Sequence, residues 1–324
     1  MRRIAAWSVC VLAALSLVCP AAAQVDSPVT PNASLPAAPT QQIEIDPYDP
    51  GYTWGDTTVD TALAFVNAEK AFARSVEAEL GVTFNLVETD YFLFYTDLSE
   101  REAYEWQRVL DLMYERVSSL LGIPDGINVF RGKATVFLFA DKRGFVEFEQ
   151  RFYNHRVSFE AGICHQHGTG EVRIAFYRID HERAMRQLMV HEAAHGVVHR
   201  YRSPNRVPDW INEGIAEWTA FAVLNFVQPF RHREAVSKRA IVARGNRLGE
   251  AFWQDGNFAA EDYGAALGLT KVLLRKGRPA FHDFIGQIKD GQSYEAAMQD
   301  IYGYGIDRLV ALYGRTLNIR DLRP

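Results

Sequence analysis

Two histidines and a glutamate lie close together in the stretch HEAAH at residues 191–195. In a helix, residues four apart share one face, so His191 and His195 can both reach a single metal ion. Glu192 is turned about 100° around the helix axis from His191, so it can stand beside the ion without binding it. The pattern predicts a metal site with two imidazole ligands and Glu192 as the general base that activates water.

A second acidic segment, PDWINEGIAEW at residues 208–218, follows shortly afterwards. Pro208 and Asp209 are typical of the first turn of a helix, which predicts a helix that folds back antiparallel across the short 203–207 connection. Glu213 would then face the two histidines. Two imidazoles and one carboxylate leave the fourth position of a Zn²⁺ ion open for water, as in hydrolytic sites. We therefore expect one zinc ion.

The same predicted helix carries two further residues of interest. Glu217 lies four residues after Glu213, on the same face, where it can accept the second N–H of a ligating histidine. The alternative for Glu217 is a solvated charge on a helix surface. Gly214 costs a helix interior about 1 kcal/mol relative to alanine, and a close helix–helix approach near the metal would explain its presence.

Together, HEAAH and WINEGIAEW resemble the gluzincin metallopeptidases, whose pattern is HExxH followed by WxxEGxAE. The likeness is greatest to the peptidase-MA-like domains of exported bacterial proteins. It covers residues 84–317 and is specific at the two motifs. The resemblance implies a zincin-like fold, zinc ligands His191, His195 and Glu213, and catalytic Glu192. It also implies that Tyr263, at the start of a later helix, donates to the negatively charged oxygen of the tetrahedral intermediate.

Other residues are also candidates for these roles. Tyr263 could instead be a core or surface tyrosine, and His232 and Tyr201 are weaker candidates for the donor to the oxygen. A metzincin would need glycine at 198 and its third histidine at 201, where this chain has Val198 and Tyr201. His199 continues the ladder of His191 and His195, but the intervening turns carry it away from the metal and favour a polar or surface role.

The stretch CHQH at residues 164–167 lies in a predicted hairpin just before the HEAAH helix. His165 and His167 share one strand face, so they suit either a second metal site or polar positions beside the cleft. Cys164 could occupy the zinc, but it lacks the base and helix context of a nucleophile. An edge strand here could hold an extended substrate by main-chain pairing.

Hydrophobic periodicity and turn residues predict the elements that position these groups. Helices are expected over 57–80, 99–121, 144–151, 181–201, 208–224, 230–243, 261–276, 278–289, 293–302 and 305–317. Strands are expected over 84–87 and 91–95, over 134–140, and in a hairpin over 161–177. The expected fold is α+β, with a mixed β-sheet in the half over 56–180 packed on a mostly helical half over 181–324.

The first residues predict export. Arg2 and Arg3 precede an apolar run over 4–18, and a small-x-small ending leads to Ala23, which together indicate a signal peptide over 1–23. The run is short for a membrane span, so we expect no stable span after cleavage. An uncleaved anchor or lipidation is the alternative. The Pro- and Ala-rich stretch over 24–55 predicts a flexible leader.

The composition narrows the function class. The chain has 324 residues, is 48% hydrophobic and carries a net charge of −5, without the basic footprint of a nucleic-acid binder. We expect an exported zinc metallopeptidase, periplasmic or extracellular in a bacterium, that acts on a peptide or protein. An inactive zincin-like domain that binds peptide or cell-wall material would have no need of Glu192. A structural zinc site would have four protein ligands.

Overall fold

A computed structural model of the chain describes residues 47–55, 57–225 and 227–324. The predicted signal peptide and residues 24–46 of the predicted leader lie outside these ranges. The strands are β1 Asn85–Glu88, β2 Phe92–Thr96, β3 Ala134–Phe139, β4 Gly162–Gln166 and β5 Val172–Tyr177. The α-helices are α1 Val59–Leu80, α2 Glu100–Leu121, α3 Lys142–Tyr153, α4 Glu182–Arg200, α5 Asp209–Leu224, α6 Val227–Ala243, α7 Glu250–Trp253, α8 Tyr263–Leu273, α9 Arg278–Lys289, α10 Tyr294–Tyr302 and α11 Ile306–Leu317.

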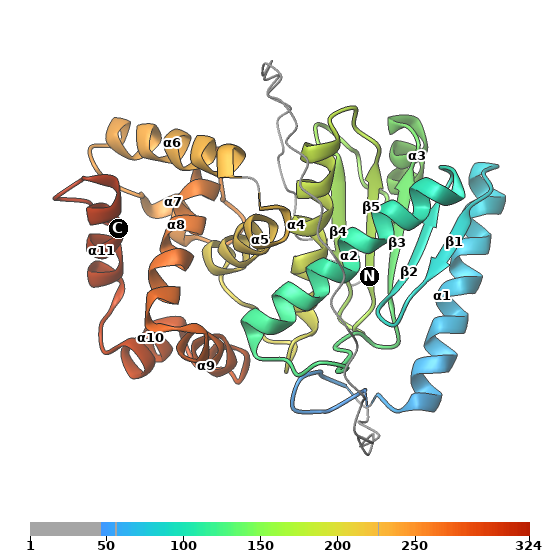
Figure 1. Cartoon of the computed structure of the whole chain (residues 1–324), viewed down its shortest axis with the longest axis horizontal. Helices are drawn as coiled ribbons and strands as arrows, with labels where there is room; N and C mark the ends of the chain where they lie inside the picture. The colour runs from blue at the N-terminus through green and yellow to red at the C-terminus, as the bar shows by residue number, and fades with distance from the viewer. Residues whose placement is uncertain (1–46, 56, 226) are drawn as a thin grey trace, which may run out of the picture.

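The strands form one mixed sheet in the order β1-β2-β3-β5-β4. β2, β3 and β5 are parallel, whereas β1 and β4 run antiparallel to their neighbours at the two edges. β4 and β5 form the predicted hairpin, with Cys164 opposite Ile174. The sheet and α1–α4 occupy one half of the molecule, and the later helices occupy the other (Figure 1). The predicted α+β class, with a mixed sheet in the first half and a mostly helical second half, is confirmed.

The sheet is covered on both faces, which explains why its central strands are apolar throughout. In β3, Val136 and Leu138 belong to the large core that includes α2 and α4. Phe137 and Phe139 point the other way, into a smaller core with α1 and α3. Because side chains alternate along a strand, one apolar run builds both cores.

Helix ends follow the local sequence closely in some places and not in others. Ser99 caps α2 in a capping box with Glu102, and Gly122 closes the helix at φ 68°, as predicted. The helix predicted over 261–276 is instead α8 flanked by short 3-10 turns, and the single turn α7 was not predicted.

None of the described helices combines the length and the apolar character that a membrane crossing requires.

The end of the predicted leader differs from the expectation. Thr53 pairs with Tyr201 in an isolated β-bridge, and its hydroxyl donates to the carbonyl of Val129 at 2.6 Å. The indole of Trp54 donates to the carbonyl of His199 at 2.9 Å and lies under the guanidinium of Arg200. The packed part of the chain therefore begins before residue 56. Hydrogen bonds to Val129, His199 and Arg200 hold this segment in place, and such contacts leave no periodicity in its sequence.

Candidate metal centre

The three predicted ligands meet between α4 and α5. Nε2 of His191 lies 3.0 Å from Oε2 of Glu213, and Nε2 of His195 lies 3.5 Å from the same oxygen. One ligand atom from each residue falls within 4.8 Å of the other two, and all three side chains are buried. A tetrahedral ion with bonds of about 2.0–2.2 Å holds its ligand atoms about 3.3–3.6 Å apart, close to the 3.0 and 3.5 Å between the histidine nitrogens and Glu213. The cluster can therefore hold a metal ion.

The charges of the cluster are coupled. Burial alone would raise the pKa of Glu213, but the charge of His195 and the hydrogen bond with His191 outweigh it. The pKa of this carboxyl is held well below its usual range. Glu213 is therefore an anionic oxygen donor at neutral pH, the form that a metal ion requires.

Close packing against α8 fixes α5, the helix that carries Glu213. Gly214 lies against α8, where an added Cβ would come within 2.8 Å of the carbonyl oxygen of Ala266 and would clash with the hydroxyl of Thr270. The glycine is there because the backbones approach each other closely, as the sequence suggested. This contact seats the helix that carries Glu213.

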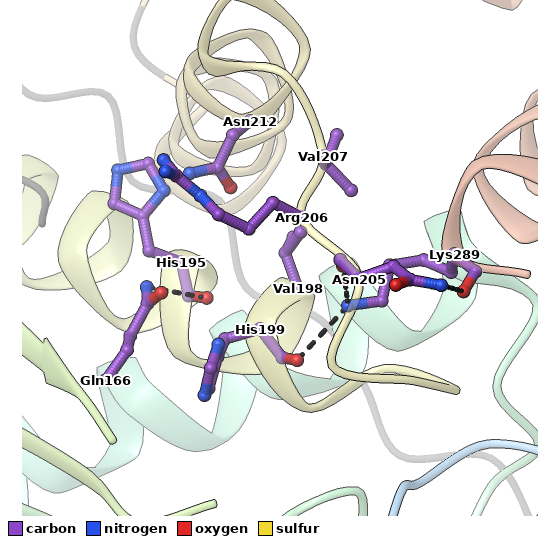
Figure 2. A pocket seen from close by; sticks show the side chains of 9 residues that line it. All are labelled: Gln166, His195, Val198, His199, Asn205, Arg206, Val207, Asn212 and Lys289. Carbon is purple, nitrogen blue, oxygen red and sulfur yellow. Dashed lines mark hydrogen bonds between the residues drawn. The ribbon is translucent and has the colours of Figure 1, made fainter. Parts of the chain in front are cut away.

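A pocket adjoins the cluster at His195 and extends along the 203–207 connection to α9 (Figure 2). The side chains that line the pocket include amides, cations and aliphatic groups. They come from β4, α4, α5, α9 and the 203–207 connection. The residues that line it are Gln166, His195, Val198, His199, Asn205, Arg206, Val207, Asn212 and Lys289. A substrate group bound there would lie directly beside the metal ligands.

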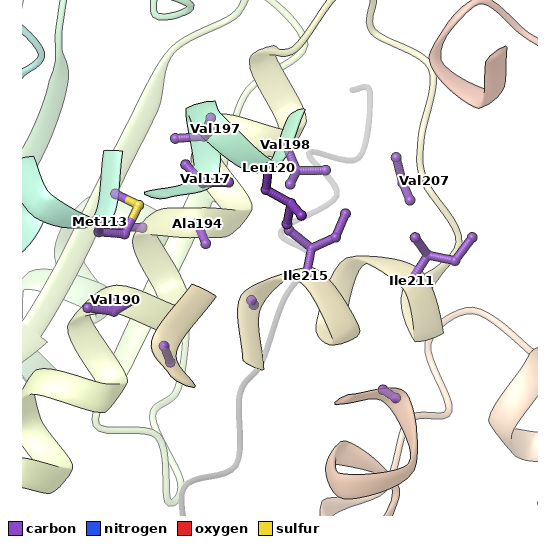
Figure 3. Packing of buried hydrophobic residues seen from close by; sticks show 14 of the residues in the cluster. Met113, Val117, Leu120, Val190, Ala194, Val197, Val198, Val207, Ile211 and Ile215 are labelled. Carbon is purple, nitrogen blue, oxygen red and sulfur yellow. The ribbon is translucent and has the colours of Figure 1, made fainter. Parts of the chain in front are cut away.

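Apolar side chains of α2, α4 and α5 pack together beside the ligand residues, and Val198 and Val207 of the same cluster also line the pocket (Figure 3). Met113 and Leu120 of α2 belong to the same buried cluster as Ala194 of α4 and Ile215 of α5. Ala194 lies between His191 and His195 in the sequence, and Ile215 follows Glu213 by two residues. The core thus holds the ligand-bearing turns of both helices.

Glu217 lies behind His191. Its Oε1 is 3.1 Å from Nδ1 of His191, the nitrogen opposite the one that faces Glu213. The carboxylate is fully buried and also contacts the guanidinium of Arg233, from α6. The amide oxygen of Gln187, in the orientation that satisfies both groups, accepts from Arg233 at 3.1 Å. Glu217 is therefore an interior charge with a cationic partner and not a solvated one.

Glu192 is fully buried on α4, directly after His191. Cys164 of β4 is buried as well, and burial together with the negative charge of Glu192 raises the pKa of its thiol well above the usual range. A thiol held in the protonated form is neither a nucleophile nor a metal ligand. This agrees with the absence of a nucleophile's surroundings in the sequence.

Tyr263 begins α8 next to the cluster. Its ring centroid lies 5.8 Å from that of His191, and Phe258 packs edge-on against it at 5.2 Å. Only 5% of the residue is exposed. The structure thus places the tyrosine beside a metal ligand.

The remaining candidates lie elsewhere. The hydroxyl of Tyr201 donates to the carbonyl of Leu121 at 2.9 Å, inside the core. Nε2 of His199 donates to the carbonyl of His167 at 3.2 Å, and burial lowers the pKa of His199 to about 4. His232 lies on α6 and is not part of the His-His-Glu cluster. None of these three residues joins the metal ligands.

The two histidines of the hairpin form a different arrangement. His165 stacks on Tyr153 with ring centroids 3.5 Å apart and contacts Glu149 at 2.9 Å, on the sheet face covered by α3. Within the ranges 47–55, 57–225 and 227–324, His191, His195 and Glu213 form the one group with metal-binding geometry. Burial lowers the pKa of His167, which lies just beyond β4.

Sequence reasoning missed the residues that approach from distant elements. Arg233 and Lys289 lie on α6 and α9, and Arg206 lies on the connection between the ligand helices. No spacing relates them to the HEAAH motif. No local signal marks them, since acidic residues lie near each cation in the sequence, namely Glu234, Asp283 and Asp209.

No protein-family model matches the chain, and no curated protein matches it.

Proposed function

We propose that the protein is a zinc-dependent metallopeptidase of gluzincin type, exported to the periplasm or the outside of a bacterial cell. The observation that carries the proposal is the buried convergence of His191, His195 and Glu213 beside a pocket. Two imidazoles and one carboxylate are the donor set of hydrolytic zinc sites, and they leave room for water and substrate. The signal-like first 23 residues support export.

His191, His195 and Glu213 would hold the ion, and the contact of Glu217 with Nδ1 of His191 would fix the orientation of that ring. When bound, zinc supplies Lewis-acid chemistry, which lowers the pKa of water and polarises a carbonyl. Glu192 takes a proton from the attacking water and passes it to the leaving amine. Tyr263 donates a hydrogen bond to the oxygen that becomes negative during attack.

The substrate is a peptide or protein in extended form. β4 is an edge strand of the described sheet, and its last residue, Gln166, lines the pocket beside His195. An extended chain can pair with such an edge through main-chain hydrogen bonds. This arrangement supports a polypeptide over a small metabolite.

The test compares the wild type with Glu192→Gln after zinc loading, using a mixed peptide library. Both proteins should bind one zinc ion, and the variant should lose about 10²–10⁴-fold in cleavage rate. Glu182→Gln serves as the matched control, because Glu182 is exposed at the start of the same helix.

Equal hydrolysis by the wild type and Glu192→Gln would exclude the mechanism. Zinc binding without cleavage of any library member would favour the alternative, an inactive domain that binds peptide or cell-wall material. Failure of the wild type to bind zinc would reject the proposal altogether.

A further inference from the structure

The pocket beside His195 has a one-sided charge. Its two charged side chains other than the ligand histidine are Arg206 and Lys289, and both are cationic. Gln166, Asn205 and Asn212 add amide groups, and Val198 and Val207 add apolar surface. Among the described residues that line the pocket there is no aspartate or glutamate. A cleft lined by one sign of charge concentrates groups of the opposite sign.

Lys289 contributes a buried amine to this wall, and because its pKa is about 7 it is partly charged at neutral pH. Only 1% of the residue is exposed, and its ammonium donates to the carbonyls of His199 at 3.2 Å and Asn205 at 2.7 Å. Carbonyl oxygens satisfy the N–H groups but do not neutralise the charge. Burial and the nearby charge of Arg200 lower the pKa of Lys289 to about 7, as expected where the surroundings are already positive.

Arg206 brings its guanidinium toward the metal end of the pocket. Figure 2 shows its side chain extending from the connection toward His195 and Asn212. Its Nη2 lies 3.3 Å from Oδ1 of Asp209, and 56% of the side chain is exposed. The planar fork of a guanidinium matches a carboxylate in two parallel hydrogen bonds, so a substrate carboxylate can compete with this exposed ion pair.

Asp209 is itself anchored away from the pocket. Its Oδ2 accepts from the backbone N–H of Gly256 at 2.6 Å, and its own N–H donates to Asp255 at 3.0 Å. Asp209 therefore stays at the start of α5 and can steer Arg206 without filling the pocket. A neighbouring recess also contains Asn205 and Arg206 and continues to Tyr294, so Arg206 stands between the two.

We propose that this pocket recognises a carboxylate of the substrate next to the scissile bond, with Arg206 as the specificity-determining residue. The inference rests on the proposed peptidase function. The carboxylate comes either from an aspartate or glutamate side chain or from the C-terminus of the substrate. Lys289 adds long-range attraction, and Asn212 and Gln166 offer amide groups to the bound residue.

The first experiment measures kcat/KM for peptide pairs that differ only by Glu against Gln near the cleavage site, and by a free against an amidated C-terminus. The wild type should prefer one carboxylate form by about tenfold to a hundredfold. A preference in the first pair assigns the side chain, and one in the second assigns the C-terminus. Equal rates in both pairs would overturn the inference.

The second experiment repeats these pairs with Arg206→Met and Arg206→Glu. The preference should fall to near unity in Arg206→Met and shift toward a lysine-containing peptide in Arg206→Glu. Arg231→Met is the matched control, since Arg231 is exposed on α6 away from the pocket lining. Measuring the zinc content verifies that the candidate metal site is intact in each variant. A preference that survives Arg206→Met would reject the role of Arg206.

A binding measurement separates this inference from the peptidase proposal. In zinc-loaded Glu192→Gln protein, the carboxylate member of the preferred pair should bind at least about tenfold tighter than its neutral counterpart. Adding Arg206→Met should remove that difference. If no peptide is cleaved by the wild type but this difference persists, the pocket is supported and the peptidase function fails. If the wild type cleaves peptides but the two members of the pair bind equally well, the peptidase function is supported and the carboxylate pocket is rejected.

Discussion

Oε1 of Glu217 lies 3.1 Å from Nδ1 of His191, and the same carboxylate also contacts Arg233. Contacts from α6 through α5 to α4 therefore lead to His191, one of the three residues that could hold a metal ion. A carboxylate that accepts from the distal nitrogen of a histidine fixes the tautomer and makes the other nitrogen more basic. Glu217→Gln should weaken zinc affinity by about 10–100-fold. Competition with a chromogenic chelator measures this, with Glu182→Gln as control. Unchanged affinity would show that the contact does not orient the ligand.

Arg233 should matter for stability before any metal is added. Glu217 is fully buried, so removing its cationic partner leaves an interior charge poorly compensated. Arg233→Met is expected to lower the free energy of unfolding of the metal-free protein by about 3 kcal/mol. Urea unfolding measures the change. Arg231→Met, two residues earlier on the exposed side of α6, should lie within about 0.5 kcal/mol of the wild type. Similar losses in both variants would contradict the argument.

Tyr263→Phe removes a single hydroxyl beside the candidate metal centre. The ring contacts with His191 and Phe258 remain, so the fold and the metal content should be unchanged. If the hydroxyl stabilises the developing negative oxygen, kcat should fall by about 10²-fold or more. Steady-state kinetics with zinc analysis of the same samples checks this. Tyr104→Phe, on an exposed tyrosine of α2, is the control. Full activity in Tyr263→Phe would remove the residue from the mechanism.

Gly214 and Gly286 form a matched pair of helical glycines. A Cβ at 214 would come within 2.8 Å of a backbone carbonyl, whereas at 286 it would meet nothing closer than 3.8 Å. Gly286→Ala should therefore stabilise the protein slightly or leave it unchanged, since alanine favours helix by about 1 kcal/mol. Gly214→Ala should destabilise it by about 1–3 kcal/mol and weaken zinc binding. Thermal unfolding with and without zinc distinguishes the two. Equal behaviour would mean that α5 can move away from α8.

The lowered pKa of Lys289 predicts that the free energy of unfolding rises with pH above neutrality. Its pKa is about 7 in the folded protein and near 10.5 in an ordinary lysine, so between these values the unfolded chain binds more protons. The contribution of Lys289 to the free energy of unfolding should therefore rise with pH from 7 to 10.5, by up to about 1.4 kcal/mol per unit. Below pH 7 both states are protonated and this contribution is constant.

The comparison is between the metal-free wild type and Lys289→Met at pH 7, 8 and 9. The stability of the wild type relative to the variant should increase across this series. Lys238→Met replaces an exposed lysine of α6 and should follow the wild type at every pH. A constant difference between the wild type and Lys289→Met would show that the buried lysine titrates normally.

Local patterns account for the elements that were predicted well. Ser99 and Gly122 mark both ends of α2 because capping depends on neighbours three or four residues away. The β4–β5 hairpin follows from a short turn between two apolar runs, with Gly170 at φ 96° in the turn. The candidate metal ligands could be predicted for the same reason, because they lie on two consecutive helices joined by a short connection.

Distant contacts could not be predicted from spacing. Arg233 reaches Glu217 only because α6 packs against α8, which in turn packs against α5, and Lys289 reaches the carbonyl of Asn205 from α9. Likewise, Thr53 and Trp54 read as part of a featureless leader, although single hydrogen bonds to α4 and to Val129 hold them in place. Such contacts depend on how the elements pack together, which no local period encodes.

The glycine contact between α5 and α8 bears on the proposed catalytic function. α5 carries Glu213 and Glu217, and α8 starts at Tyr263. At Gly214 the backbone of α5 packs directly against Ala266 and Thr270 of α8, so the two helices are held closely together. The spacing between the metal ligand and the tyrosine is thus set during folding. Under the proposed function, a substrate would meet a preorganised pair of charge-stabilising groups, so little reorganisation energy would remain to be supplied at the transition state.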